Sequence, residues 1–220
     1  MKNLDLTLYL VTNRGKLPWE TFCSIIEQAI EGGVTVIQLR EKEISQKEFI
    51  KIGRSLKERL QLKGKQIPLI INDAIEVALE IGAEGVHLGQ SDASVEKARQ
   101  MLGKKAIIGL SVETMEQARA AGLLDIDYIA ASPIFATPSK LNTAAPWGLK
   151  GLKELCRISK YPVVGIGGIN SNNVPNIISS GATGVAVISA IFYAESPFLA
   201  AQEFHSKIMK VKDLRTKKIN

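Results

Sequence analysis

The sequence is poor in cysteine and aromatic residues, and it lacks long apolar runs. Its two cysteines, Cys23 and Cys156, lie far apart and match no metal-ligand or redox spacing, so we expect reduced thiols in a cytoplasmic protein. Aromatic residues make up 5% of the chain and are not interleaved with basic residues, so no nucleic-acid partner is expected despite a net charge of +6. No apolar run reaches about 18 residues, and the first residues lack the apolar core of a signal peptide, so no membrane partner is expected either.

Short apolar runs alternate with amphipathic segments along the whole chain of 220 residues, of which 45% are hydrophobic. The expected strands cover residues 6–11, 34–39, 67–71, 85–88, 106–110, 127–131, 162–166 and 184–188. The expected helices cover residues 18–31, 45–62, 74–81, 94–102, 114–121, 147–159, 173–180 and 197 to about 212. Apolar runs that are continuous rather than alternating indicate strands buried on both faces, as in a parallel sheet.

Eight β/α units in succession favour the (β/α)8 TIM barrel, because parallel strands joined by right-handed crossovers can close on themselves. We therefore expect a single α/β domain over residues 1–220, with a basic tail that frays from about residue 213. The alternative is an open doubly wound sheet, which usually carries a glycine-rich dinucleotide fingerprint after its first strand. Residues 12–16, Thr-Asn-Arg-Gly-Lys, are no such fingerprint.

In a barrel of this kind, the residues that follow each strand directly form the functional site. Here these positions hold cationic, acidic, small hydroxyl and glycine residues. They are Thr12, Asn13, Gln38, Arg40, Lys42, Asn72, Asp73, Gln90, Asp92, Ser111, the stretch 132–140, Gly165, Gly167, Gly168 and Ser189.

Neither of the two histidines is expected to be catalytic. His87 lies inside a strand, where a single histidine is usually a hydrogen-bonded core residue, and His205 lies on the last helix. The functional edge therefore has no side-chain nucleophile and no obvious general base. We expect a reaction in which a metal and cationic side chains draw charge onto a phosphate leaving group.

Asp73 and Asp92 each follow one of two consecutive strands. Neighbouring parallel strands lie about 4.8 Å apart and end at the same edge of the sheet. The two carboxylates are therefore expected close enough together to share one hard cation such as Mg²⁺. The alternative is that each aspartate caps the helix that follows it.

Gln38, Arg40 and Lys42 alternate along the end of a strand, so their side chains should point to one side. Arginine and lysine that converge on a functional edge suit a polyanion, since the guanidinium grips phosphate oxygens bidentately. The alternative is an internal ion pair with Glu41 or Glu43.

The last two strands are followed by Gly167-Gly168 and by Ser189, a pattern typical of a backbone phosphate site in these barrels. The alternative is a tight turn without a ligand. The longest loop, residues 133–146, carries Lys140 and is expected to reach over bound phosphates, unless it is a plain surface loop.

Six segments together resemble those of thiamine phosphate synthases. They are 38–42 (Gln-Leu-Arg-Glu-Lys), 71–73 (Ile-Asn-Asp), 85–92 (Gly-Val-His-Leu-Gly-Gln-Ser-Asp), 133–140 (Pro-Ile-Phe-Ala-Thr-Pro-Ser-Lys), 164–169 (Val-Gly-Ile-Gly-Gly-Ile) and 187–191 (Val-Ile-Ser-Ala-Ile). The resemblance runs from about residue 6 to 205. It implies an Mg²⁺-dependent transferase that condenses 4-amino-5-hydroxymethyl-2-methylpyrimidine diphosphate with a thiazole phosphate, giving thiamine phosphate and pyrophosphate.

The resemblance also implies roles for individual residues. Contacts to the pyrimidine diphosphate would come from Gln38, Leu39, Arg40, Glu41, Lys42, Asn72, Ser111 and Lys140. Contacts to the thiazole phosphate would come from Thr137, Pro138, Ser139, Gly168, Ile188 and Ser189. Catalysis would involve Arg40, Lys42, Ser111 and Lys140, and Asp73 and Asp92 would hold the metal. Such a reaction needs no base, which agrees with the lack of histidine at the functional edge.

Two positions depart from the family pattern. Ala74 stands where arginine often follows Asn-Asp, and Glu113 stands where many relatives have histidine. Relatives that isomerise the thiazole use that histidine, so Glu113 disfavours this alternative activity. A barrel that only binds the phosphates as a regulator is a further alternative, disfavoured by the retained acids and Lys140. The sequence leaves the oligomeric state open, including a homo-oligomer.

Overall fold

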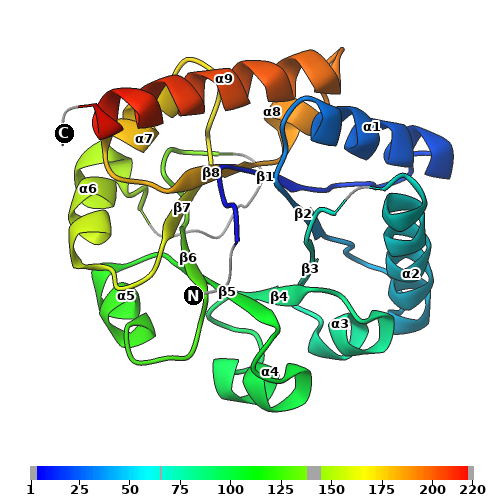
Figure 1. The fold of residues 1–220 in the computed structure, drawn as a ribbon. Helices are drawn as coiled ribbons and strands as arrows, with labels where there is room; N and C mark the ends of the chain where they lie inside the picture. Colours follow the sequence, from blue (N-terminus) through cyan, green and yellow to red (C-terminus); the bar gives the residue numbers. More distant parts are fainter. Residues whose placement is uncertain (1–3, 65, 138–144, 218–220) are drawn as a thin grey trace.

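The computed structural model describes residues 4–64, 66–137 and 145–217, and over these residues eight parallel strands close into a barrel surrounded by helices (Figure 1). The strands are β1 (Leu8–Val11), β2 (Val36–Leu39), β3 (Leu69–Asn72), β4 (Gly85–Leu88), β5 (Ile107–Val112), β6 (Tyr128–Ala131), β7 (Val163–Ile166) and β8 (Gly184–Val187). The helices are α1 (Trp19–Glu31), α2 (Gln46–Leu62), α3 (Ile75–Ile81), α4 (Val95–Leu102), α5 (Met115–Ala121), α6 (Gly148–Ile158), α7 (Val174–Ser179), α8 (Ser189–Phe192) and α9 (Pro197–Thr216). The TIM barrel expected from the sequence is confirmed.

The ring closes where β1 pairs with β8, with Leu8 opposite Val185 and Leu10 opposite Val187. Successive side chains of a strand point to opposite faces, so the strands serve two separate cores. One face, with residues such as Leu8, packs against the helices, and the other face, with residues such as Tyr9, fills the inside of the barrel. Burial on both faces explains why the strand sequences are largely apolar.

Polar side chains define where several helices begin. The side chains of Ser45, Ser94, Thr114 and Ser196 each accept a hydrogen bond from the backbone N–H three residues further on. Such caps satisfy backbone donors that have no partner inside the helix. Gly82 ends α3 in the left-handed region with φ of 60°, which glycine adopts without strain.

Most element bounds lie within two residues of those expected, and two differences have a clear structural reason. Strand β5 continues to Val112 rather than Leu110, because Ser111 and Val112 pair with Ala130 and Ala131 of β6. The short helix α8 is not among the expected helices, since four residues carry too little periodicity to be recognised.

Helix α9 runs along the outside of the barrel against α1, α7 and α8 (Figure 1). A Cβ atom on Gly32 would lie 2.3 Å from the Phe198 carbonyl oxygen, so glycine is needed for α1 to approach α9 this closely. The basic tail continues in α9 as far as Thr216, and the Arg215 guanidinium donates to the Ile178 carbonyl at 2.9 Å.

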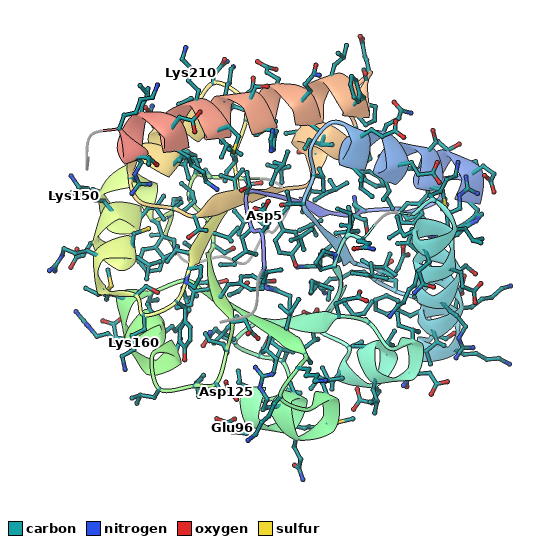
Figure 2. All side chains as sticks on the ribbon, viewed as in Figure 1. Asp5, Glu96, Asp125, Lys150, Lys160 and Lys210 are labelled. Carbon is teal, nitrogen blue, oxygen red and sulfur yellow. The ribbon has the colours of Figure 1, made fainter. Side chains whose placement is uncertain are left out.

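Charged side chains at the periphery, including Lys150, Lys210 and Glu96, lie on the outer surface of the helix ring (Figure 2). Across the ranges that the structure describes, no helix combines the length and the apolar character needed to cross a membrane.

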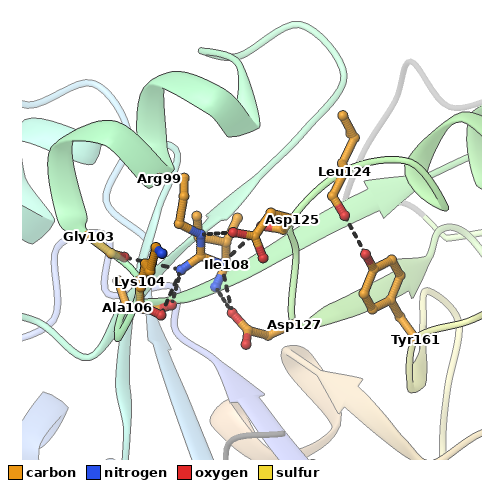
Figure 3. Close-up of polar contacts among 9 residues, drawn as sticks. All are labelled: Arg99, Gly103, Lys104, Ala106, Ile108, Leu124, Asp125, Asp127 and Tyr161. Carbon is orange, nitrogen blue, oxygen red and sulfur yellow. Dashed lines mark hydrogen bonds and ion pairs between the residues drawn. The ribbon is translucent and has the colours of Figure 1, made fainter.

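Arg99 ties together the segments that lead into β5 and β6 (Figure 3). Its Nη1 donates to the carbonyl oxygens of Gly103, Lys104 and Ala106 at 3.2, 3.3 and 2.7 Å. Its Nη2 donates to the Asp125 carbonyl at 2.9 Å and to Asp127 Oδ2 at 3.2 Å. Asp127 Oδ2 also accepts from the Ile108 backbone N–H at 2.8 Å, so one guanidinium fixes the entry of two neighbouring strands.

We expect Arg99→Lys to lower the free energy of unfolding by about 2 kcal/mol, because an ammonium group cannot donate to all of these carbonyls at once. The Arg99 side chain is only 13% exposed, so solvent does not replace the lost contacts. Urea-induced unfolding followed by circular dichroism measures the change. The control Arg54→Lys alters an exposed ion pair with Glu80 at 2.9 Å and should change stability by less than about 0.5 kcal/mol. Equal losses in the two variants would contradict the clamp role of Arg99.

Candidate functional site

A pocket of about 730 Å³ opens at the carboxyl ends of the strands, and all eight strands contribute to its lining. Of the residues predicted for the site, many line this pocket. They are Gln38, Arg40, Lys42, Asn72, Asp73, Asp92, Ser111, Thr137, Gly168, Ile188 and Ser189. Pro138, Ser139 and Lys140 lie outside the described residues. The pocket therefore joins the acidic, cationic and glycine-containing segments at one edge of the barrel.

The end of β2 separates its side chains by alternation. Gln38, Arg40 and Lys42 line the pocket, whereas the Leu39 side chain is fully buried in the core between the barrel and the helices. Glu41 also points away from the pocket and accepts a hydrogen bond from Arg14 Nε at 3.2 Å. Any ligand contact by Leu39 or Glu41 would therefore involve their backbone atoms.

The internal ion pairs considered for Arg40 and Lys42 are not formed, because Glu41 pairs with Arg14 and Glu43 forms no ion pair in the part of the chain that the structure describes. Burial raises the pKa of the Glu41 carboxyl, and the bond to Arg14 opposes this shift. Within the described residues Arg40 forms no ion pair, and its backbone N–H donates to Thr12 Oγ1 at 3.1 Å. The guanidinium of Arg40 is thus available at the pocket edge.

Asp73 and Asp92 lie side by side at the ends of β3 and β4. Asp73 Oδ2 accepts from Asn72 Nδ2 at 2.6 Å and lies 4.0 Å from Lys42 Nζ. Asp92 Oδ2 accepts from the Gly89 backbone N–H at 2.7 Å. Burial, and then the neighbouring Asp92 carboxylate, raise the pKa of Asp73 to about 6.

Neither aspartate caps a helix. Helix α3 follows Ala74 and has no side-chain cap, and α4 is capped by Ser94. Asp73 adopts a φ of 63°, a left-handed conformation that is uncommon for residues other than glycine. The capping alternative is therefore wrong for both residues.

The paired carboxylates fit a hard divalent cation. Mg²⁺ commonly takes one or two carboxylates from the protein and completes its shell with water and phosphate oxygens. In the described ranges, no third histidine, cysteine or acidic ligand joins Asp73 and Asp92. A positive charge between the two carboxylates would offset the repulsion that raises the pKa of Asp73.

The glycine pair after β7, Gly167 and Gly168, lies on the opposite side of the pocket from Asp73 and Asp92, because β7 lies opposite β3 in the order of strands around the barrel. Gly168 has a φ of 64°, and a Cβ atom there would lie 2.8 Å from the Ala136 carbonyl oxygen. Glycine is therefore required for the turn after β7 to pack against the loop after β6. Ile188 and Ser189, at the start of the short helix α8, complete this part of the pocket.

Three buried residues of the pocket with hydrogen-bonding side chains were not predicted as site residues from the sequence. Tyr9 and Tyr128 come from β1 and β6, and His87 comes from β4. His87 hydrogen-bonds to Tyr128 and Ser111 and is 8% exposed, which confirms it as a hydrogen-bonded buried residue. A hydroxylated aromatic residue within an otherwise aliphatic strand is the sequence signal that could have identified Tyr9 and Tyr128.

Comparison with known proteins identifies close similarities along most of the chain. The family model described as thiamine monophosphate synthase matches residues 8–191. The thiamine-phosphate synthase of Vibrio parahaemolyticus is 48% identical over 196 residues, which cover 89% of this chain and 94% of the relative. That of Albidiferax ferrireducens is 46% identical over 196 residues, 89% of each chain. The solved structure of thiamine phosphate pyrophosphorylase from Pyrococcus furiosus has a TM-score of 0.83 at 34% identity and covers 94% of this chain and 98% of its own.

We expect Asp92→Asn to stabilise the protein at neutral pH, because it removes the charge that opposes ionisation of Asp73. The pKa of Asp73 is higher in the folded state than the unfolded value of about 3.9. Ionisation of Asp73 therefore destabilises the fold progressively from about pH 4 to about pH 6 and fully above that range. Because Asp73 is partly exposed, solvent screens the repulsion and the expected change is small. The Tm of the variant should be about 2 °C higher at pH 7.5 and unchanged at pH 4.

Thermal unfolding of wild type and Asp92→Asn at both pH values measures this difference. The asparagine carbonyl can still accept from the Gly89 N–H, so the loop contact is preserved. A lower Tm for the variant at pH 7.5 would show that the two carboxylates do not repel each other.

Proposed function

The chain belongs to the thiamine monophosphate synthase family, and we propose that it condenses 4-amino-5-hydroxymethyl-2-methylpyrimidine diphosphate with a thiazole phosphate in the cytoplasm. The products are thiamine phosphate and pyrophosphate. The observation that carries the proposal is the pairing of Asp73 and Asp92 beside Arg40 and Lys42 in a single pocket. This combination suits a leaving group with several negative charges.

The diphosphate would lie at the acidic and cationic side of the pocket. Asp73 and Asp92 would hold Mg²⁺, which when bound neutralises the charge that develops on the departing pyrophosphate. Arg40 can bind two phosphate oxygens through its planar guanidinium, whereas Lys42 supplies a point charge next to Asp73. Lys140, outside the described residues, is proposed as a third cation.

The thiazole phosphate would lie at the glycine-containing side. Gly168 allows close approach of the backbone, and Ser189 opens the short helix α8. Thr137 lines the same part of the pocket, and Pro138 and Ser139 follow it in the chain. Two phosphate-binding regions in one pocket support a reaction that joins two phosphorylated substrates.

The reaction needs no protein base. The C–O bond between the pyrimidine methylene and the diphosphate breaks, and its electron pair leaves with pyrophosphate. The pyrimidine amino group donates electron density to the methylene carbon, and the thiazole nitrogen then attacks that carbon with its lone pair. Arg40, Lys42 and Ser111 would hold the reacting groups in place. A reaction without a protein base also agrees with the described pocket, whose histidine, His87, is engaged in hydrogen bonds.

Purified protein given both substrates and Mg²⁺ should release one pyrophosphate for each thiamine phosphate formed. Chelation of the metal with EDTA should reduce both products to background, and added Mg²⁺ should restore them. A coupled pyrophosphate assay together with chromatography of the products measures the two yields. Conversion of the thiazole without the pyrimidine substrate would instead support an isomerase. If neither reaction is observed, the result would support a protein that only binds the phosphates.

Asp92→Asn should lower kcat/KM by at least about 100-fold although the same variant is expected to be more stable. Loss of activity combined with a higher Tm excludes unfolding as the cause. The control Glu80→Gln removes an exposed carboxylate on α3 and should retain wild-type activity. Near-normal turnover in Asp92→Asn would mean that this carboxylate holds no metal.

A further inference from the structure

A chain of hydrogen bonds crosses the floor of the pocket and links five strands. Gln38 Nε2 donates to the Tyr9 hydroxyl at 2.9 Å, and the Tyr9 and Tyr128 hydroxyls are 2.9 Å apart. The Tyr128 hydroxyl lies 2.9 Å from His87 Nδ1, and His87 Nε2 lies 2.8 Å from Ser111 Oγ. The chain therefore joins Gln38 to Ser111 through three side chains that are at most 8% exposed.

The barrel provides a specific space for the centre of this chain. A Cβ atom at position 109 would lie 2.1 Å from Tyr128 Cζ and 2.3 Å from its hydroxyl oxygen, so only Gly109 leaves room for the phenol. The Tyr128 ring packs edge-on against Tyr9 and stacks on His87, with centroid separations of 5.9 and 5.5 Å. The hydroxyl groups are thus held in place by packing as well as by hydrogen bonds.

Counting donors gives the chain a direction. Each tyrosine hydroxyl has one proton to donate, and burial raises the pKa of both tyrosines, so both protons are retained. Tyr9 accepts from Gln38, and Tyr128 is its remaining partner within the described residues, so Tyr9 donates to Tyr128. Tyr128 in turn donates to His87 Nδ1, which leaves the His87 proton on Nε2 to donate to Ser111.

Both ends of the chain face the pocket. The side-chain carbonyl oxygen of Gln38 accepts no hydrogen bond from the described residues. In the described ranges, Arg99 Nε is the only fully buried side-chain nitrogen or oxygen without a hydrogen bond, so the Gln38 oxygen must be accessible from the pocket. Gln38 and Ser111 are both lining residues. With its amide nitrogen committed to Tyr9, Gln38 presents an acceptor, and with its oxygen accepting from His87, Ser111 presents a donor.

We propose that Tyr9, Tyr128 and His87 are positioning residues. The two tyrosines hold His87 as the Nε2–H tautomer, and the whole chain fixes Gln38 as an acceptor and Ser111 as a donor toward the substrate. This inference rests on the proposed function and on the contacts with the pyrimidine diphosphate that the family resemblance implies for Gln38 and Ser111. An amino group donates to the Gln38 carbonyl, whereas an oxo group there would place two acceptors against each other. The buried chain thereby selects amino over oxo pyrimidines.

The tautomer can be measured directly, because the sequence contains only two histidines. In protein labelled with ¹⁵N-histidine, long-range ¹H–¹⁵N spectra should show His87 Nδ1 unprotonated and Nε2 protonated. The variant His205→Gln assigns the two rings. An Nδ1–H tautomer would reverse the direction of the chain, and an averaged pair of nitrogen shifts would show that no tautomer is fixed; either result overturns the proposal.

Removing single hydroxyl groups tests the link to the substrate. Tyr128→Phe should abolish the fixed tautomer and raise KM for the pyrimidine diphosphate about tenfold, with KM for the thiazole phosphate unchanged. Tyr9→Phe should leave the His87 tautomer intact but free the Gln38 amide to turn. Both variants should therefore reduce the preference for the amino substrate over its oxo analogue.

Tyr161→Phe is the matched control, since Tyr161 donates to the Leu124 carbonyl at the opposite end of the barrel (Figure 3). It should alter neither the tautomer nor either KM, and thermal unfolding should show that all three variants fold. Unchanged selectivity in folded Tyr9→Phe and Tyr128→Phe would overturn the positioning role. Absence of pyrophosphate release from wild type would instead reject the proposed function, whereas the tautomer measurement would remain valid.

Discussion

The pairing of β1 with β8 is the constraint on which the rest of the structure depends. It closes eight short strands into a ring and brings their carboxyl ends to a single edge. Closure also creates an interior where alternate side chains of every strand meet, so residues as distant in sequence as Tyr9 and Tyr128 come into contact. The pocket, its acidic edge and its hydrogen-bonded floor all follow from this one arrangement.

The acidic edge illustrates how a functional site can oppose stability. Asp73 and Asp92 are adjacent, partly buried and mutually repulsive, and Asp73 adopts a left-handed backbone conformation that is uncommon for residues other than glycine. Nothing in helix capping requires this arrangement, since Ser94 caps α4 and α3 has no side-chain cap. The proposed shared cation would give the pair a physical purpose, because it would offset the repulsion and attract an anionic ligand.

Much of the fold could be predicted from the sequence because its strands are short, largely apolar runs that alternate regularly with amphipathic helices. The two-residue period of a strand predicted that Gln38, Arg40 and Lys42 share one face, and the pocket lining confirms this orientation. Family resemblance alone does not contain this orientation, which is why it grouped Leu39 and Glu41 with them although their side chains point away. Alternation along the strand is the more informative guide to side-chain direction.

Features that depend on contacts between distant segments could not be predicted. The pairing of Glu41 with Arg14 joins two loops, and the extension of α9 is accompanied by the contact of Arg215 with the Ile178 carbonyl. Likewise, the chain from Gln38 to Ser111 requires closure of the barrel and the small size of Gly109. Neither propensity nor periodicity carries information about such long-range contacts.

The central claim is that Asp73 and Asp92 form a cation site for a diphosphate group. Its most direct test is the affinity for inorganic pyrophosphate, measured by titration calorimetry with and without Mg²⁺ in wild type and in Asp73→Asn. Wild type should bind pyrophosphate tightly only when Mg²⁺ is present, and the variant should lose this dependence on the metal. Binding that is equally tight without Mg²⁺, or unchanged in Asp73→Asn, would contradict the claim.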